Sequence, residues 1–276
     1  MTGPPTLRVG LPTLRVGLPT LRVGLPTWRA RHVWFRDWLV FRKYAITNIL
    51  PYFAEPLLFI IALGYGLGIF VGQIGGVSYA QFLAPGILCS SAMFAASYEC
   101  TYSTYVRMIF QKTFEAVLCT PVAIEDIVLG EIAWGATKSL MSGTCIFIVI
   151  WALGLVDLAS VVIILPVVVL AGLMFASLSL FFTSIVPSMD AFNYYFTLLL
   201  SPMFLVSGVF FPIDQLPAVV KDLAWLLPLT HTVNVIRPAA MGHYSGAFIL
   251  ETAWMAVFTL IFYGLATVLM KRRLLD

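Results

Sequence analysis

Long apolar runs separated by short polar segments dominate the chain after residue 45. Six runs contain the roughly 20 apolar residues that a helix needs to cross the hydrocarbon core of a bilayer. They cover about 48–70, 82–104, 127–152, 159–186, 190–211 and 247–270. The pattern predicts an all-α integral membrane protein in which residues 45–276 form one domain of six transmembrane helices.

Composition supports a membrane protein. Hydrophobic residues make up 61% of the 276 residues, and charged residues only 11%. A soluble domain carries about a quarter charged residues, because its surface must face water. We therefore expect much of the apolar surface to face lipid.

Residues 1–27 contain three copies of the heptad PTLRVGL. Because every copy holds a Pro and a Gly, we do not expect a continuous helix here. The tail is expected to be disordered, with a weak contact of its arginines to anionic lipid as the alternative. The N-terminus shows no cleavable signal peptide, so the first apolar run would serve as the insertion signal.

An amphipathic helix is predicted over 28–44. Trp34, Trp38 and Phe41 form one stripe at helical spacing, while Arg36 and Arg42 lie mostly elsewhere on the wheel. Such a helix fits the membrane interface, with its rings among the lipid headgroups and its cations on phosphates. A soluble amphipathic helix is the alternative.

The distribution of Lys and Arg predicts the orientation. Of the 16 Lys and Arg residues, thirteen fall on one side of the six-span arrangement. Only Lys221 and Arg237 fall on the other side, and Lys138 lies within a span. Because cytoplasmic segments are enriched in these cations, we expect both termini in the cytoplasm.

The longest internal cytoplasmic segment reads FEAVLCTPVAIEDIVLGE from Phe114. Its apolar stripe consists of Phe114, Val117 and Leu118, with Lys112 and Glu115 on the opposite side. Thr120-Pro121 would end this short helix, because a residue before proline disfavours the α conformation. The segment is either a connector on the bilayer surface or a docking helix for a cytosolic partner.

The last outer segment, about 212–246, has apolar pieces too short to span a bilayer of roughly 30 Å. Pro212, Pro217 and Pro228 divide it. We expect short re-entrant helices, which are tolerated where protein covers their backbone. A compact outer loop is the alternative.

Three charged residues, Glu55, Glu99 and Lys138, fall inside predicted spans. Each costs roughly 2.5–3.5 kcal/mol on insertion scales unless it is paired or faces water. A structural pair of Glu99 or Glu55 with Lys138 is favoured. A polar lining for a substrate path is the functional alternative, and a proton relay is a third.

The sequence contains no recognisable catalytic or nucleotide-binding motif. No P-loop, nucleophile elbow or zinc-protease motif is present. The four cysteines form no CxxC pair, so no metal site is expected. We expect no catalytic residue, no cofactor and no nucleic-acid partner for this chain.

Two stretches carry a resemblance to a known family. The cytoplasmic stretch resembles the E-x-L-x-x-T-P pattern of ABC-2 type membrane subunits of ATP-driven exporters. It matches at Glu115, Val117, Thr120, Pro121 and Gly130. The outer stretch resembles their re-entrant helices and matches at Ser207, Gly208, Phe210, Phe211, Pro212, Leu216, Pro217, Pro228, Leu229 and Thr230. The resemblance covers about residues 30–276 and is greatest to the nodulation-protein permeases that export lipo-oligosaccharides from rhizobia.

This resemblance implies a function. The chain would be a permease in a bacterial inner membrane, working as a homodimer with two copies of a separate ATPase that holds ATP and Mg. The segment Lys112–Pro121 would dock on that ATPase, with Phe114, Val117 and Leu118 as apolar anchors. The substrate would be an amphipathic glycolipid such as a lipo-oligosaccharide. Alternatives are a polysaccharide or drug exporter, a membrane scaffold, a lipid-modifying enzyme or a secondary transporter.

Overall fold

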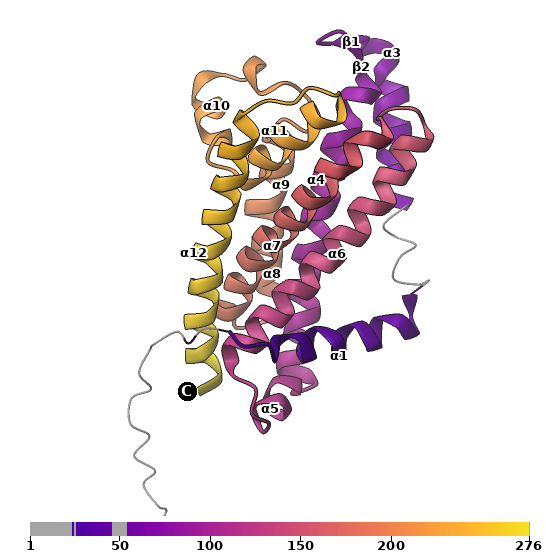
Figure 1. The fold of residues 1–276 in the computed structure, drawn as a ribbon. Helices are drawn as coiled ribbons and strands as arrows, with labels where there is room; N and C mark the ends of the chain where they lie inside the picture. The colour runs from indigo at the N-terminus through magenta and orange to yellow at the C-terminus, as the bar shows by residue number, and fades with distance from the viewer. Residues whose placement is uncertain (1–23, 25, 46–53, 276) are drawn as a thin grey trace, which may run out of the picture.

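The computed structural model describes residue 24, residues 26–45 and residues 54–275. Within these residues the chain forms one bundle of long helices, crossed at one end by the shorter helix α1 (Ala30–Lys43) (Figure 1). Apart from Gly24, the three heptads lie outside the described residues, as do the first residues of the predicted span at 48–70.

Five helices of the described residues are long and apolar enough to cross a membrane. They are Ala54–Val71, Tyr79–Phe110, Ile124–Ala152, Leu158–Ile185 and Ala247–Leu275. An all-α membrane protein is therefore confirmed. The second helix extends six residues beyond its predicted end at 104, so Arg107 lies in a helix and not in a loop.

These five helices contain the following elements. The first includes a π-helical segment (Ile60–Leu67) and α3 (Gly68–Val71). The second consists of α4 (Tyr79–Tyr98) and two π-helical segments (Glu99–Ser103 and Val106–Phe110). The third is α6 (Ile124–Ala152). The fourth is a 3₁₀ turn (Leu158–Ser160) followed by α7 (Val161–Ile185), and the fifth is α12 (Ala247–Leu275).

Small residues let the central helices approach closely. α6 packs between α4 and α7, and α12 packs along α7. A Cβ atom at Gly172 on α7 would lie 2.7 Å from Ser139 Cβ and 2.9 Å from Ala136 Cα on α6. Close backbone contact of this kind is how helices associate in lipid, where the hydrophobic effect between them is weak.

The predicted fifth span, 190–211, is helical only as far as Val206. It consists of short pieces: a 3₁₀ turn (Met189–Ala191), α8 (Phe192–Tyr194), a π-helical segment (Tyr195–Leu200) and α9 (Ser201–Val206). Pro202 lacks the N–H group that a regular helix would need at this point, and the π-helical turns directly before it absorb the break. This segment is not among the five long apolar helices of the described residues.

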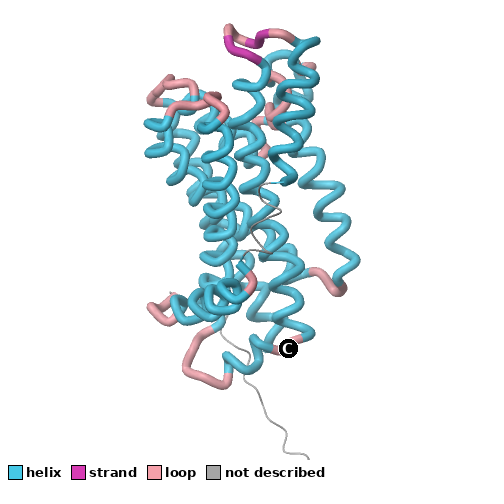
Figure 2. The backbone as a smooth tube through the Cα atoms, turned by 90° about the vertical axis from the view of Figure 1, so that its right-hand side faces the viewer, coloured by secondary structure: helices cyan, strands magenta, loops and turns pink. Residues whose placement is uncertain are grey.

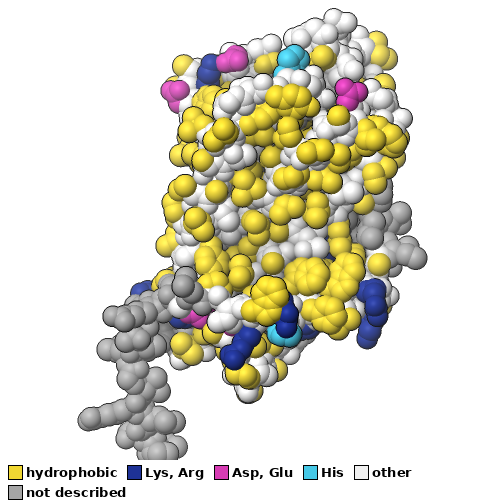
Figure 3. All heavy atoms as spheres, viewed as in Figure 1, with side chains coloured by type: hydrophobic (Ala, Val, Ile, Leu, Met, Phe, Trp, Pro, Cys, Tyr) yellow, Lys and Arg dark blue, Asp and Glu magenta, His cyan; other side chains and the backbone are white. Residues whose placement is uncertain are grey.

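The two ends of the bundle differ (Figures 1 and 2). One end, here called the α5 end, carries α1, α5 (Thr113–Leu118) and the C-terminal end of α12. The opposite α10 end carries the hairpin β1 (Gln73–Ile74) and β2 (Val77–Ser78), together with α10 (Ala218–Ala224) and α11 (Pro228–Ala240). In the hairpin, Gln73 pairs with Ser78 and Ile74 with Val77. On the face in Figure 3, Lys and Arg gather at the α5 end and the middle is apolar.

In the segment predicted to be the last outer one, Pro212, Pro217 and Pro228 each precede or begin a helix. Pro212 comes before a 3₁₀ turn (Ile213–Gln215), Pro217 before α10, and Pro228 is the first residue of α11. Proline suits these positions, because the first turn of a helix leaves its N–H groups without intrahelical acceptors. Arg237 on α11 joins this segment to the bundle by donating to the Phe82 carbonyl at 3.1 Å.

The end of α12 holds two other helices together. Lys271 forms an ion pair with Glu125 in the first turn of α6. Arg273 Nη1 donates to the carbonyls of Thr183 (2.6 Å) and Val186 (2.8 Å), at the C-terminal end of α7. Cations are favourable there, because the last carbonyls of a helix have no intrahelical donors.

Candidate functional site

Helix α1 lies directly on α6. Trp34 Nε1 donates to Thr137 Oγ1 at 2.9 Å, and the Phe41 and Trp134 ring centres lie 5.7 Å apart. A Cβ atom at Gly130 would lie only 2.5 Å from Val33 Cβ, so this glycine permits the contact. The aromatic stripe predicted to lie among lipid headgroups therefore faces the protein at Phe41, which is buried. Arg42 on the same helix is exposed.

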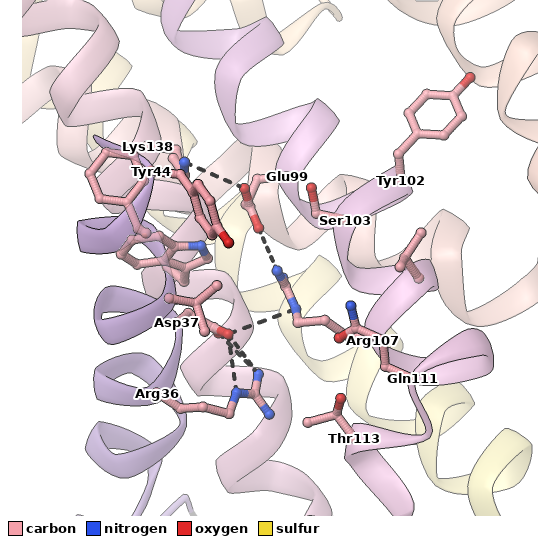
Figure 4. Close-up of a pocket in the computed structure, with 14 residues that line it drawn as sticks. Arg36, Asp37, Tyr44, Glu99, Tyr102, Ser103, Arg107, Gln111, Thr113 and Lys138 are labelled. Carbon is pink, nitrogen blue, oxygen red and sulfur yellow. Dashed lines mark hydrogen bonds and ion pairs between the residues drawn. The ribbon is translucent and has the colours of Figure 1, made fainter. Parts of the chain in front are cut away.

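Six charged side chains meet where α1, α6 and the end of the Tyr79–Phe110 helix come together. All of them except Glu131 are labelled in Figure 4. Three are cations and three are anions. We refer to Arg36, Asp37, Glu99, Arg107, Glu131 and Lys138 as the charge cluster.

Arg107 is the centre of the charge cluster. Its Nη1 lies 2.7 Å from Glu99 Oε1, and its Nη2 donates to Thr104 Oγ1 at 3.1 Å. Its Nη2 also contacts Glu131, whose side chain is fully buried and accepts from Arg36 Nη2 at 2.8 Å. The predicted span ends at 104 and would leave Arg107 in the cytoplasmic loop that follows, which is wrong because the helix runs to Phe110. The helix continues past this cation because buried carboxylates on neighbouring elements compensate its charge.

Lys138 pairs with Glu99 and not with Glu55. Its Nζ lies 3.9 Å from Glu99 Oε2 and 4.1 Å from the centre of the Phe41 ring, over its face. Glu55 is exposed on the Ala54–Val71 helix. Of the two partners considered for Lys138, the structure selects Glu99.

Asp37 on α1 is the titratable member outside the spanning helices. Burial raises the pKa of its carboxyl to about 7, and the charge of Glu131 adds to the rise. Arg107 and Arg36 act in the opposite direction. The carboxyl accepts from Arg36 Nη2 at 2.9 Å and lies 3.9 Å from Arg107 Nε. The charge of this cluster therefore changes near neutral pH.

Two cavities adjoin the charge cluster. The larger, about 570 Å³, is called the charged cavity, and Arg36, Asp37, Arg107 and Trp134 are among the residues that line it. The smaller, about 410 Å³, is called the aromatic cavity. Its lining includes Glu55, Pro56, Phe59, Ile87, Ser90, Ser91, Phe94, Tyr98 and Phe204. Glu99, Ser103 and Lys138 line both cavities.

The predicted docking segment forms α5, but its apolar stripe faces inward. Phe114 is only 1% exposed, and Val117 and Leu118 are half-buried. Phe114 therefore fixes α5 to its own chain, and this surface does not offer it to a partner as an anchor. The sequence pattern identified the stripe correctly but could not show what covers it.

The outward side of this segment is polar, with one large exposed ring. Lys112 and Glu115 are exposed and form an ion pair at 4.0 Å. Phe110, directly before α5, is 67% exposed. Thr120 Oγ1 donates to the Val117 carbonyl at 2.6 Å, and Arg29 contacts the Pro121 carbonyl.

The remaining sequence candidates lie elsewhere. Gly208 has a φ of +80°, which glycine adopts without strain. Gly208, Phe211, Pro212, Pro217 and Pro228 belong to the segment that includes α10 and α11, away from the charge cluster. No group of three or more His, Cys, Asp or Glu in the described part of the chain is placed to hold a metal ion.

Sequence reasoning missed half of the charge cluster. Glu131 lies inside the predicted span 127–152 and Asp37 inside the predicted interfacial helix, so an acid in an apolar segment was the available signal. It also missed the pair of His231 and Glu251 at the α10 end, which joins α11 to α12.

Comparisons with known proteins place these features in context. Residues 29–241 match the family described as ABC-2 type transporter. The chain is 43% identical over 243 residues to nodulation protein J of Rhizobium leguminosarum bv. trifolii, covering 88% of this chain and 93% of the relative. It is 42% identical over 248 residues to nodulation protein J of Rhizobium meliloti, covering 90% and 95%. It is also 23% identical over 242 residues to the inner membrane transport permease YadH of Escherichia coli, covering 88% and 94%.

Proposed function

Since this chain belongs to the ABC-2 type transporter family and is a transport permease, we propose that it is the membrane subunit of an ATP-driven exporter. The proposed cargo is an amphipathic glycolipid, with a lipo-oligosaccharide nodulation signal as the first candidate. The word nodulation in the names of the nodulation protein J relatives agrees with a nodulation signal as the cargo, and the name of YadH supports a bacterial inner membrane. A polysaccharide or a drug is the alternative cargo within the family.

The proposed topology has six crossings with both termini in the cytoplasm. The α5 end would be cytoplasmic, which agrees with the Lys and Arg that gather there (Figure 3). The broken segment Met189–Val206 would be the additional crossing. Its irregular turns are tolerable at membrane depth where protein covers the backbone.

The observation that carries the proposal is how α5 is attached to the bundle. Its outer side exposes Lys112 and Glu115 beside Phe110, whereas Phe114 is buried in its own chain. The helix leading into it carries Arg107, which is paired with Glu131 on α6 and lies near Asp37 on α1. A partner that moves α5 would thus move two further helices with it.

The proposed partner is a separate ATPase that holds ATP and Mg, in a complex of two copies of each subunit. ATP can act on this chain only if the ATPase contacts α5 differently in its two states. Of the residues of the Ala54–Val71 helix, 17% are buried within the chain. In the most apolar 18-residue stretch of Tyr79–Phe110, 83% are buried. That exposed surface is available to lipid or to a second copy.

Co-purification tests the proposal. The full-length chain is co-expressed with a candidate P-loop ATPase from the same genome and extracted in mild detergent. ATP hydrolysis is measured in lipid nanodiscs with and without glycolipid. We expect a stable complex whose hydrolysis rises with glycolipid. The double charge reversal Lys112→Glu with Glu115→Lys should weaken the complex, and Arg42→Glu on α1 is the control. A chain that binds no ATPase would be a scaffold or an enzyme, and the exporter assignment would be lost.

A further inference from the structure

His231 on α11 is a buried titratable residue far from the charge cluster, at the α10 end of the bundle, where α11 meets α12 (Figure 1). Its side chain is only 7% exposed, and both of its ring nitrogens face oxygen atoms. Nδ1 contacts a carboxylate oxygen of Glu251, and Nε2 lies 3.0 Å from the carbonyl oxygen of Trp225. The ring therefore bridges α12 and the C-terminal end of α10.

This arrangement needs two protons. A neutral imidazole carries one N–H group, and its other nitrogen is an acceptor. Because a carbonyl oxygen has no hydrogen to donate, Nε2 must carry a proton to bond Trp225. A second proton must then lie between Nδ1 and the Glu251 carboxylate, whichever of the two atoms holds it. The pair of His231 and Glu251 is therefore complete only in its protonated form.

Two further contacts fix the orientation of the pair. The His231 ring stacks on Trp254 of α12, with the ring centres 3.8 Å apart and an angle of 22° between the planes. The second carboxylate oxygen of Glu251 accepts from Asn234 Nδ2 at 3.2 Å. Ring and carboxylate are thus held face to face, and a change in their proton count acts on a defined geometry.

Other charged groups on the neighbouring elements do not pair with His231 among the described residues. α4 and α7 also pack against α11, and they contain no charged residue. On α10, Lys221 pairs with Asp214 at 2.5 Å, and Asp222 is exposed. Arg237 on α11 donates to the Phe82 carbonyl, and the cations of α12 lie in its last turn. Since histidine is the side chain that ordinarily titrates between about pH 5 and 8, this contact should respond in that range.

Loss of the second proton would act on α10. Because an ionised carboxylate is the stronger acceptor, the remaining ring proton stays on Nδ1. The lone pair of Nε2 then faces the Trp225 carbonyl, and that hydrogen bond is lost. Val219 on α10 is 80% exposed, so side-chain burial attaches this helix weakly. Its C-terminal end is held at the Ala224 carbonyl by Thr230 Oγ1 (2.6 Å) and at Trp225 by His231.

We propose that His231 and Glu251 form a proton-operated latch at the α10 end. With the second proton bound, the latch ties the C-terminal end of α10 to α12. When that proton leaves, Trp225 is released and α10 loosens from the bundle. The latch itself does not depend on the cargo. Its side of the membrane rests on the proposed function, under which the outer end of the permease would respond to the pH outside the cytoplasm.

Nitrogen NMR tests the protonation of the latch. The chain contains three histidines, so isotope-labelled histidine in the full-length chain in nanodiscs gives three ring spectra. His32 and His243 are exposed and serve as internal references, and His231→Phe assigns the remaining ring. We expect Nε2 of His231 to carry a proton at about pH 5 and to lose it by about pH 8. An Nε2 whose protonation is the same at both pH values would overturn the latch.

Hydrogen exchange tests the release of α10. The protection factor of the peptide that contains α10 corrects for the effect of pH on intrinsic exchange. From about pH 5 to about pH 8 it should fall about three- to tenfold in the wild type, as expected for the loss of one hydrogen bond. His231→Phe, which lacks both ring nitrogens, should give the lower value at both pH values.

Glu251→Gln separates the latch from a general effect of pH. The amide of this variant can donate to Nδ1, which leaves the only ring proton on Nε2, facing Trp225. Protection of α10 should therefore stay high at both pH values. Asp222→Asn, which removes an exposed carboxylate from α10, is the matched control and should fall like the wild type. A wild type without the fall, or an equal fall in Glu251→Gln, would overturn the latch.

These outcomes are separable from that of the proposed function, because neither measurement involves an ATPase or a glycolipid. A pH-dependent α10 in a chain that binds no ATPase keeps the latch and removes the exporter. ATPase binding with equal protection of α10 at both pH values keeps the exporter and removes the latch. Asp37 also titrates near neutral pH but lies on α1 at the α5 end, so exchange resolved by peptide distinguishes the two groups.

Discussion

Arg107 Nη2 lies 2.5 Å from Glu131 Oε2, joining the helix that leads into α5 to the first turns of α6. Glu131 has no exposed surface, so its charge is stabilised by protein groups alone. Arg36 supplies the second cation and Thr104 a hydroxyl, at 2.9 Å from Glu131 Oε2. The contact makes α1, α5 and α6 mechanically dependent on one another.

Removing Arg107 should destabilise the protein strongly. Arg107→Ala leaves Glu131 and Glu99 buried with fewer cations, and breaking a buried pair in this way costs about 3–5 kcal/mol. Thermal unfolding in detergent measures the effect. Arg42→Ala, which removes an exposed cation from α1, should leave the melting temperature nearly unchanged. Equal melting temperatures for both variants would contradict the central role of Arg107.

The titration of Asp37 should make stability depend on pH. Its pKa is about 7 in the folded protein against an ordinary 3.8. Because the folded protein binds this proton more tightly than the unfolded chain, the free energy of unfolding falls as pH rises from 3.8 to about 7 and levels off above. Asp37→Asn removes this pH-dependent contribution to the free energy of unfolding. From roughly pH 5 to about 7, the upper part of that window, the melting temperature of the wild type should fall relative to that of the variant. If the melting temperatures of the wild type and of Asp37→Asn change in parallel with pH, the raised pKa of Asp37 is refuted.

Adding one methyl group at Gly130 should separate α1 from α6. In Gly130→Ala the new Cβ would lie 2.5 Å from Val33 Cβ and 2.9 Å from the Ala30 carbonyl, which requires a backbone shift. Overpacking of this kind costs about 1–3 kcal/mol. Gly264→Ala on α12 is the control, because no atom lies within 4 Å of its added Cβ. Thermal unfolding of the two variants should therefore differ, with Gly130→Ala the less stable.

Substitutions of Phe110 and Phe114 should have different effects, one on ATP hydrolysis by the complex and the other on the stability of the fold. Phe114→Ala removes a side chain that is 1% exposed and should cost about 3–5 kcal/mol. Phe110→Ala removes a ring that is 67% exposed, so stability should hold while glycolipid-stimulated ATP hydrolysis falls. Unfolding and hydrolysis are measured on the same preparations. If Phe110→Ala hydrolyses ATP like the wild type, this ring is no part of the ATPase contact.

Cys119 offers a direct test of orientation. It is exposed at the end of α5, whereas Cys89 and Cys100 are buried. A membrane-impermeant maleimide should label Cys119 in inside-out vesicles and leave it unlabelled in right-side-out vesicles. Cys119→Ser should abolish that labelling, which identifies the site. Labelling confined to right-side-out vesicles would reverse the topology and remove the ATPase contact with it.

The helices could be predicted because long apolar runs can be stable only in lipid, whatever their neighbours are. The stripe at Phe114, Val117 and Leu118 likewise predicted a short helix at the right place. What covers a stripe depends on elements distant in sequence, so Phe114 was assigned to a partner although its own chain buries it.

The charge cluster lay beyond sequence reasoning for the same reason. Glu99 and Glu55 were equivalent partners for Lys138 until the fold placed Glu99 3.9 Å from its amine. Arg107 looked like a loop cation, because an isolated arginine is unfavourable in a span. Its carboxylate partners at positions 99 and 131 lie on two different helices, and no spacing along the chain reveals that they converge.

Lys271 and Arg273 connect α12 to the start of α6 and to the end of α7. These two side chains are made after all the helices that they join, so the ribosome completes the α5 end of the bundle last. A nascent chain that stopped before Lys271 would hold every long helix but lack the contacts that fasten them there. The contacts that fasten α12 to α6 and α7 at this end can therefore form only after α12 has been translated.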